Sequence, residues 1–417
     1  MPLQGPIVVV ADTCAEDLVE ALRAAGVFPI VETRWADAES ALTKVDPEAL
    51  VLADACADQA RIIKLADRLK ARTGPFIPVV ARTREDGGAI LPDALSIAAS
   101  APADRLASRI ASAQRIRTLH GTVLRRIGTL ASHGEAPPEL PTSDPLDEAS
   151  VLLAGRGRSY PMLSVAVGER VGLVGALSVE NAARALQARD IDGVVIGEGF
   201  GPRIVDALLT VMAENVRFRE LPIAMLAGHS GSIGRFAEHL PNLERIGEGP
   251  QRLVERFLPY VRLHAFGERL RRMLKSLDAR GMVDPDTGLL GHEAFWRDLN
   301  RAVGDAEKRG VGLSMARFSF KGSDRRSGLD AARLLARLMR QVDFACREAD
   351  NSIFAVFTDT DLRAAHVVAR RLASILKNTT MAPDRKRVGI DAAVTLATLR
   401  PTDSVDSLIA RVVGKAG

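Results

Sequence analysis

The chain has 417 residues, a formal net charge of +4, 47% hydrophobic residues and a mean hydropathy of +0.05. This composition excludes an intrinsically disordered chain and leaves room for about three domains. The pI is about 9.1, but aromatic residues make up only 4% and no basic run is interleaved with them. Nucleic-acid binding is therefore not expected.

The three cysteines, Cys14, Cys56 and Cys346, are scattered through the chain. They lack the C-x-x-C spacing of zinc sites and predict neither a metal centre nor a disulfide framework. No apolar run reaches membrane-spanning length, and the first residues lack the charged and apolar segments of a signal peptide. We therefore expect a cytoplasmic protein without a membrane segment.

Apolar strand patterns alternate with helical patterns from residue 7 to residue 131, at the spacing of βαβ units. Strands are expected at 7–10, 27–31, 50–52 and 77–81, and helices at 15–25, 37–44, 62–71 and from 102 onward. The pattern resembles a CheY-like response-regulator receiver domain with a doubly wound parallel sheet. We assign this domain to residues 1–131.

Three polar residues of this domain match the phosphorylation site of the receiver family. Asp54 ends the third strand, where the phosphoacceptor stands, and Asp12 follows the first strand, where an acidic pair holds magnesium. Thr83 follows the fourth strand, as the family's hydroxyl residue does. Ala11 and Ala101, however, replace an acidic partner and a lysine of the family. Asp54 is therefore a phosphoacceptor candidate, and a structural role as a helix N-cap is the alternative.

Residues 132–149 are rich in Pro, Gly and polar residues and are expected to form a linker. The alternation then begins again and resembles a second receiver over residues 150–280. Strands are expected at 151–153, 171–177, 193–196 and 223–226, and helices at 162–167, 180–187, 204–214, 233–240 and from 250 onward. Gly197 takes the phosphoacceptor position and has no side chain to phosphorylate. By fold analogy, such a domain serves as a dimerisation or docking surface.

The most informative stretch lies between residues 329 and 357, where Arg340 and Asp343 follow a helical run. An arginine presents a planar fork of donors that pairs with guanine or phosphate, and an aspartate can accept from guanine N–H groups. At this spacing both side chains project from one side of a helix end. The alternative is a surface salt bridge worth roughly 0.2–1 kcal/mol. The same R-x-x-D tetrapeptide recurs elsewhere, for example at Arg203 and Asp206.

This stretch resembles the centre of a GGDEF (diguanylate cyclase) domain, in which an R-x-x-D inhibitory site precedes a signature in a β-hairpin turn. Residues 349–353 occupy the place of that signature. Ala349 and Asp350 stand where two glycines would let the backbone approach a nucleotide, and Asn351 and Ser352 are weak substitutes for metal-binding carboxylates. Ala316 stands where the family has a metal-binding aspartate. The resemblance implies a degenerate GGDEF domain with a mostly antiparallel sheet over residues 281–417, without catalytic residues and without metal.

The same resemblance implies a binding site for cyclic di-GMP. Counted without a gap from the signature, Arg371 takes the position of a further arginine, on the next helix, that completes the family's site. The predicted ligand-binding residues are therefore Arg340, Asp343 and Arg371.

The order receiver, receiver, GGDEF resembles the PleD family of response regulators, and the degenerate signature resembles alphaproteobacterial adaptors of cell-cycle proteolysis. What the resemblance implies is a non-enzymatic cyclic di-GMP receptor that forms a homodimer through its receivers. It would recruit protein partners toward the ClpXP protease at a cell pole. The residues leave open a weakly active cyclase, a nucleotide-independent receiver scaffold and a regulator controlled by phosphorylation of Asp54.

Overall fold

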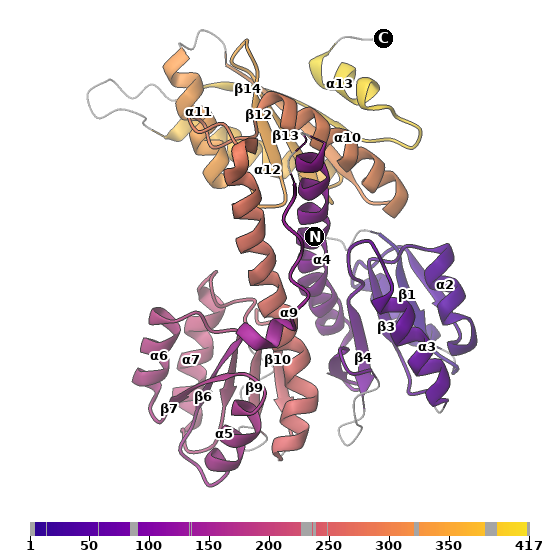
Figure 1. Ribbon diagram of the computed structural model, residues 1–417, viewed down its shortest axis with the longest axis vertical. Coiled ribbons are helices and arrows are strands. Elements are labelled where there is room, and N and C mark those ends of the chain that lie inside the picture. The colour runs from indigo at the N-terminus through magenta and orange to yellow at the C-terminus, as the bar shows by residue number, and fades with distance from the viewer. Residues whose placement is uncertain are drawn as a thin grey trace.

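The computed structural model describes most of the chain, namely residues 5–13, 15–56, 58–83, 91–132, 134, 136–226, 236, 239–247, 249–320, 325–379 and 390–414. Two units built on five-stranded sheets lie at one end of the molecule and a unit with a four-stranded sheet lies at the other (Figure 1). Two long helices, α4 (Ala103–Ala131) and α9 (Pro250–Leu277), run side by side between the two ends. No helix within the described ranges is long and apolar enough to cross a membrane.

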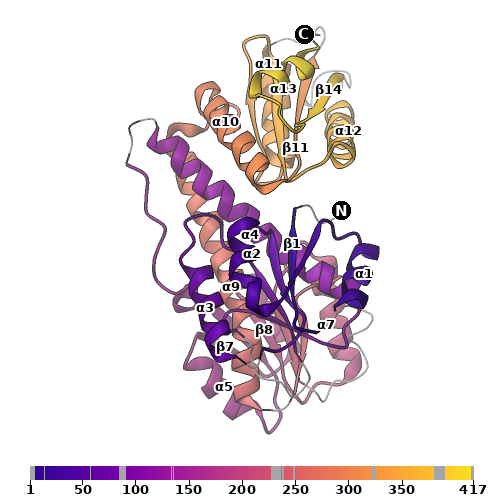
Figure 2. The same cartoon turned by 90° about the vertical axis from the view of Figure 1, so that its right-hand side faces the viewer.

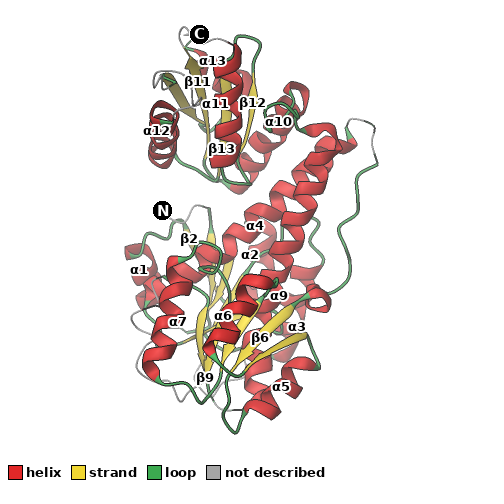
Figure 3. Ribbon diagram, turned by 90° about the vertical axis from the view of Figure 1, so that its left-hand side faces the viewer, coloured by secondary structure: helices red, strands yellow, loops and turns green. Residues whose placement is uncertain are grey.

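The first unit is a parallel sheet with the strand order β2-β1-β3-β4-β5. Its central strands are continuous apolar runs, which is typical of parallel strands covered on both faces. Helices α1 and α4 pack on one face of the sheet, and α2 and α3 pack on the other. In Figure 3 this unit lies behind the second one. The strands are β1 (Ile7–Val10), β2 (Ile30–Thr33), β3 (Ala49–Leu52), β4 (Val79–Thr83) and β5 (Leu95–Ala98), and the helices before α4 are α1 (Glu16–Ala24), a 3-10 turn (Trp35–Asp37), α2 (Ala38–Lys44) and α3 (Gln59–Lys70).

The second unit repeats this plan with the order β10-β9-β8-β6-β7. Counted from its own first strand, both units have the 2-1-3-4-5 order of the doubly wound receiver fold. Helices α5 and α9 cover one face, and α6 and α7 cover the other. The elements are a 3-10 turn (Pro145–Glu148), β6 (Ser150–Ala154), α5 (Tyr160–Gly168), β7 (Gly172–Ala176), α6 (Val179–Ala188), β8 (Gly193–Ile196), α7 (Pro202–Glu214), β9 (Ile223–Leu226) and β10 (Leu243–Ile246).

The third unit is an antiparallel sheet in the order β12-β13-β11-β14. Side chains alternate between two apolar clusters along each strand, so Met315 and Val356 face one cluster while Ala316 and Ala355 face the other. The elements are a π-turn (Asp278–Met282), α10 (His292–Arg309), β11 (Leu313–Phe320), α11 (Arg325–Leu338), β12 (Phe344–Arg347), β13 (Ile353–Thr358), α12 (Leu362–Asn378), β14 (Ala392–Thr398) and α13 (Val405–Val413).

The core of the third unit is completed by the two long helices. Leu119, Val123 and Leu130 of α4 and Leu270 and Leu274 of α9 belong to the same buried cluster as the apolar faces of α10 and β12. Figure 2 shows the third unit resting on the far end of this helix pair. The position of the sheet relative to the other units is therefore fixed by apolar packing.

The sheets confirm the predicted fold class, and several element boundaries differ from prediction. The second strand begins at Ile30 and not at residue 27, because Pro29 has no N–H to donate to a strand ladder. Strands β5 and β10 were not predicted, since Ser96 in β5 and Glu244 and Arg245 in β10 interrupt the continuous apolar run that marks the strands that were predicted. The predicted helix at 233–240 lies mostly outside the described residues.

Candidate functional site

Arg340 and Asp343 form a two-bond ion pair in the short turn between α11 and β12. Arg340 Nε and Nη2 donate to the two carboxylate oxygens of Asp343, each at 2.8 Å. Arg340 Nη2 also donates to the carbonyl of Thr358 at 3.0 Å and to Thr360 Oγ1 at 2.9 Å. The amide of Thr358 in turn donates to Asp343 Oδ1 at 3.1 Å. The pair is thus held in place by the residues at the end of β13.

The two partners differ in their access to solvent. The side chain of Arg340 is 43% exposed, whereas that of Asp343 is 1% exposed. Burial raises the pKa of the Asp343 carboxyl, and the paired guanidinium of Arg340 offsets only part of that rise. A ligand approaching from solvent would therefore meet the guanidinium, whereas the carboxylate is covered in this arrangement.

The ion pair borders a cavity of about 510 Å³ between α9 and the α11–β12 turn. This volume lies in the usual range of small-molecule sites. Its wall includes apolar side chains, among them Leu274, Leu289 and Phe344. Five cationic side chains and three carboxylates also line it, namely Arg126, Arg271, Arg272, Lys275 and Arg340 against Glu268, Asp278 and Asp343.

The cations of the cavity are only partly neutralised by its carboxylates. Arg126 Nε lies 3.4 Å from Asp278, and Arg271 pairs with Glu268 on its own helix. Arg272 pairs with Glu148, which is not among the lining residues. Lys275 is exposed and has no ion-pair partner in the described part of the chain. Arg126 lies 3.5 Å from Asp298 as well, so Lys275 is the one lining cation without an ion-pair partner in the described residues. The lining itself contributes five cations against three carboxylates, which favours an anionic ligand.

Arg371 lies on α12 and is exposed, next to the buried Leu372. It does not line the cavity, and within the described residues no hydrogen bond or ion pair links it to Arg340 or Asp343. The structure thus brings together two of the three residues that the resemblance implied.

The hairpin between β12 and β13 contains the segment that stands in place of the family signature. The amide of Glu348 donates to the Ser352 carbonyl at 2.8 Å, and Asn351 has a φ of +66°. Arg317 donates to Asp350 at 2.6 Å, and the hydroxyl of Ser352 donates to the same carboxylate. The polar groups of this turn therefore bond to one another and to the neighbouring strand.

Ala316 is fully buried on β11, opposite Ala355. A methyl group thus stands at the position where the sequence resemblance led us to expect a carboxylate. Across the described residues, no group of three or more His, Cys, Asp or Glu side chains is arranged to hold a metal ion.

Asp54 and Asp12 come together at the carboxyl edge of the first sheet. Asp54 Oδ2 accepts from the amides of Asp12 and Thr13 at 2.9 and 3.0 Å and from the Thr13 hydroxyl, while Oδ1 accepts from Trp35 Nε1 at 2.8 Å. Burial alone would raise the pKa of Asp54, but these hydrogen bonds outweigh it and hold the pKa below its usual value. In this arrangement both oxygens of the candidate phosphoacceptor have donors from the protein.

Thr83, the third residue of the predicted phosphorylation site, is buried at the end of β4. Its hydroxyl accepts from Arg256 Nη2 of α9 at 3.3 Å. The hydroxyl therefore contacts the second unit. In that unit, Gly197 follows β8 and its amide donates to the Ala154 carbonyl.

The cationic residues of α4 and α9 in the cavity were not predicted from the sequence. A signal for them existed, because Arg271, Arg272 and Lys275 lie at spacings of one, three and four residues on one helix. Such spacing places at least two of them on one face. Nothing in the sequence, however, indicated that this face meets Arg340.

Comparisons with known proteins found no matching family profile and no matching curated protein. Among solved structures, the coiled coil and GGDEF domain of DgcB from Caulobacter crescentus, in complex with c-di-GMP, is similar over 35% of this chain and 84% of that chain, with 19% identity and a TM-score of 0.31. The GGDEF domain of FimX from Pseudomonas aeruginosa is similar over 32% and 90%, with 19% identity and a TM-score of 0.29. The diguanylate cyclase SiaD with its activator SiaC, also from Pseudomonas aeruginosa, is similar over 35% and 64%, with 17% identity and a TM-score of 0.30.

Proposed function

We propose that this chain is a cyclic di-GMP receptor that binds its ligand in the cavity beside Arg340 and does not synthesise it. The observation that carries the proposal is the exposed guanidinium of Arg340 at the border of a cavity with an excess of cations. Cyclic di-GMP offers two phosphates and two guanine edges. Arginine forks bind both kinds of group through paired hydrogen bonds.

Each part of the site has a role in this proposal. Arg340 and the carboxylate of Asp343 would bind a guanine edge together, and Arg271, Arg272 and Lys275 would bind the phosphates. The apolar wall formed by Leu274, Leu289 and Phe344 would cover the faces of the bases. Arg371 is retained in the proposal as an outer cation that an exposed part of the ligand would meet.

Isothermal titration with cyclic di-GMP tests the site. Wild type should bind, and Arg340→Ala should lose binding. A matched control is Arg203→Ala, which removes the exposed arginine of another R-x-x-D tetrapeptide, on α7. Equal binding by wild type and Arg340→Ala would eliminate the site, and an Arg371→Ala variant measures whether the outer cation contributes.

The absence of synthesis is proposed from the turn at 349–353 and from Ala316. The carboxylate of Asp350 already accepts hydrogen bonds from Arg317 and Ser352. Ala316 has no oxygen with which to coordinate magnesium. Incubation with GTP and magnesium should therefore yield no cyclic di-GMP. Product that appears at a rate proportional to protein concentration would establish a weak cyclase instead.

A nucleotide-independent scaffold is the second candidate function. It is favoured by the ion pair itself, since Arg340 and Asp343 already satisfy one another without ligand. If titration of the wild type with cyclic di-GMP gives no binding heat while protein partners still bind, this function is supported.

The role of the bound state is proposed from the resemblance to the PleD family alone. We propose that the receptor acts as an adaptor, recruits partners for ClpXP proteolysis at a cell pole and forms a homodimer through its receiver-like units. The β5 and α4 side of the first unit already packs on the second unit through Arg109 and Arg256. A homodimer would therefore use other receiver surfaces. Sedimentation of the full chain with and without cyclic di-GMP tests this part.

A further inference from the structure

Asp359 sits in a turn between the two threonines that hold the ion pair of the proposed site. Thr358 binds Arg340 through its carbonyl and Asp343 through its amide, and Thr360 binds Arg340 through its hydroxyl. The φ of Asp359 is +48°, a left-handed conformation that few residues other than glycine, asparagine and aspartate adopt. The conformation of this turn therefore determines where both threonines present their polar groups.

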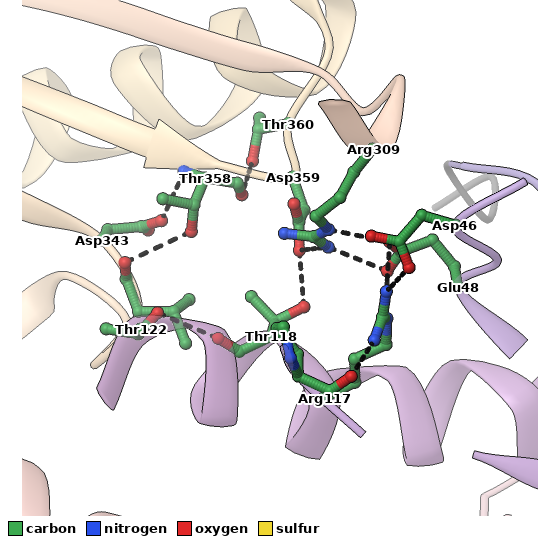
Figure 4. A network of polar contacts seen from close by, with 12 residues as sticks. Asp46, Glu48, Arg117, Thr118, Thr122, Arg309, Asp343, Thr358, Asp359 and Thr360 are labelled. Atoms are coloured by element: carbon green, nitrogen blue, oxygen red, sulfur yellow. Dashed lines mark hydrogen bonds and ion pairs between the residues drawn. The ribbon is translucent and has the colours of Figure 1, made fainter. Parts of the chain in front are cut away.

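Two side chains from other elements fix the carboxylate of Asp359 (Figure 4). The hydroxyl of Thr118, on α4, donates to Asp359 Oδ2, and Arg309 Nη2, at the end of α10, donates to the same oxygen at 3.2 Å. The turn is thus anchored to α4 as well as to α10.

Arg309 continues the connection to the first receiver-like unit. Its Nε and Nη2 donate to the two carboxylate oxygens of Glu48, each at 2.8 Å. Glu48 precedes β3, is 2% exposed, and also accepts from Arg117 Nε at 3.1 Å. Its backbone amide donates to the Pro6 carbonyl, so the residue is part of the sheet edge. A Cβ on nearby Gly5, whose φ is +91°, would lie 2.3 Å from Glu48 Cγ, so the glycine makes room for this carboxylate.

We propose that Glu48, Arg309 and Asp359 form a latch that couples the first receiver-like unit to the cyclic di-GMP site, an inference that rests on the proposed function. A displacement of the first unit must break the contact of Glu48 with Arg309. Arg309 Nη2 is then no longer held in place beside Asp359. The turn that presents Thr358 and Thr360 to the ion pair is left with the contact of Thr118 and the strand contacts of the two threonines. Coupling between two sites is reciprocal, so ligand that engages Arg340 also changes how firmly the first unit docks.

Two conservative variants test the latch in the full chain. Thr118→Val removes the hydroxyl donor to Asp359 and keeps the shape of the side chain, and Glu48→Gln removes the charge that Arg309 binds. The control is Glu293→Gln, which breaks the exposed pair of Glu293 with Arg297 elsewhere on α10. Hydrogen exchange at the amides of Thr358 and Thr360 is measured without ligand, and cyclic di-GMP affinity by titration.

The latch predicts faster exchange at both amides in Thr118→Val and Glu48→Gln, and an affinity about fivefold or more below that of wild type. The control should match wild type in both measurements. Unchanged exchange in Glu48→Gln, the variant that removes the charge holding Arg309 to the first unit, overturns the latch. Faster exchange with unchanged affinity overturns its coupling to the site. If wild type does not bind cyclic di-GMP at all, the proposed function fails, whereas the ligand-free exchange still decides whether the latch holds the turn.

Discussion

Arg109 of α4 donates to Glu244 Oε1 of β10 at 2.7 Å, in an ion pair that is almost fully removed from solvent. The same guanidinium donates to the carbonyls of Ser96, Pro241 and Leu243. Arg109→Ala would leave the Glu244 charge buried without its main partner. We expect a loss of roughly 3–5 kcal/mol in the free energy of unfolding, measured by urea denaturation.

The control for this prediction is on the same helix. Arg115 also pairs with a glutamate of the second unit, Glu220, but its side chain is 60% exposed. Arg115→Ala should therefore cost less than about 1 kcal/mol. Equal losses in both variants would contradict the assigned role of burial.

His120 predicts a pH dependence of stability. Burial, together with the charge of Arg117, lowers the pKa of His120 to about 4, and its Nδ1 accepts from the amide of Phe76 at 3.2 Å. In the unfolded chain His120 is protonated below about pH 6.5, whereas in the folded chain it stays neutral down to about pH 4. The free energy of unfolding therefore decreases as the pH falls through this window. The loss at pH 4 should be at most about 3 kcal/mol.

Unfolding free energies of wild type and His120→Gln, measured between pH 4 and 7, check this expectation. The variant should lose most of the slope between pH 6.5 and pH 4. His292→Gln, which removes a histidine with 61% side-chain exposure, serves as the control. A slope in His120→Gln equal to that of wild type would show that another group titrates.

Lys275 offers a test of the cavity that leaves folding intact, because its side chain is exposed and has no ion-pair partner in the described ranges. Lys275→Gln should weaken cyclic di-GMP binding by about two- to fivefold, the equivalent of one exposed ion pair. The difference should shrink at high salt as screening increases. Lys44→Gln, on α2 of the first unit, should bind like wild type, and a salt-independent loss would point away from a phosphate contact.

Asp54→Asn is expected to destabilise the first unit by roughly 1–3 kcal/mol, since a charged acceptor of several hydrogen bonds is lost. The pKa of Asp54 is lowered in the folded chain, so its contribution is present above the unfolded pKa of about 4 and disappears as the pH falls through the lower folded value. Urea unfolding at pH 7 and pH 3 measures this difference, and Trp35 fluorescence should report the lost contact.

Asp17→Asn, which removes an exposed carboxylate of α1, is the control for Asp54→Asn. An unchanged stability in Asp54→Asn would remove the structural role. Acetyl phosphate labelling of wild type that is absent in Asp54→Asn would favour the alternative of a phosphorylation-controlled regulator.

Most of the fold was predictable because its strands are uninterrupted apolar runs. Ile7–Val10 and Gly193–Ile196, for example, are buried on both faces and appear in the sequence as such. The pairing of Arg340 with Asp343 was also foreseeable, because residues at i and i+3 meet around a turn.

The rest of the site depended on contacts between elements far apart in the sequence. Arg126 of α4 and Lys275 of α9 line the same cavity as Arg340 only because both helices pack against the third unit. The bonds of Asp54 to Trp35 likewise depend on how one loop folds over a sheet edge. Local pattern contains no information about such neighbours, so their positions required the structure.

The apolar cluster that Leu119, Val123 and Leu270 share with α10 has a practical consequence for work on fragments. A C-terminal fragment that begins at residue 281 would expose the apolar face of α10 to water. It would also leave the buried Asp298 without Arg125, whose Nε donates to Asp298 Oδ2 at 3.0 Å. Such a piece should aggregate or unfold, whereas one that keeps both long helices should remain soluble. The third unit and the two long helices share one buried core, so a cut between them exposes apolar side chains to water.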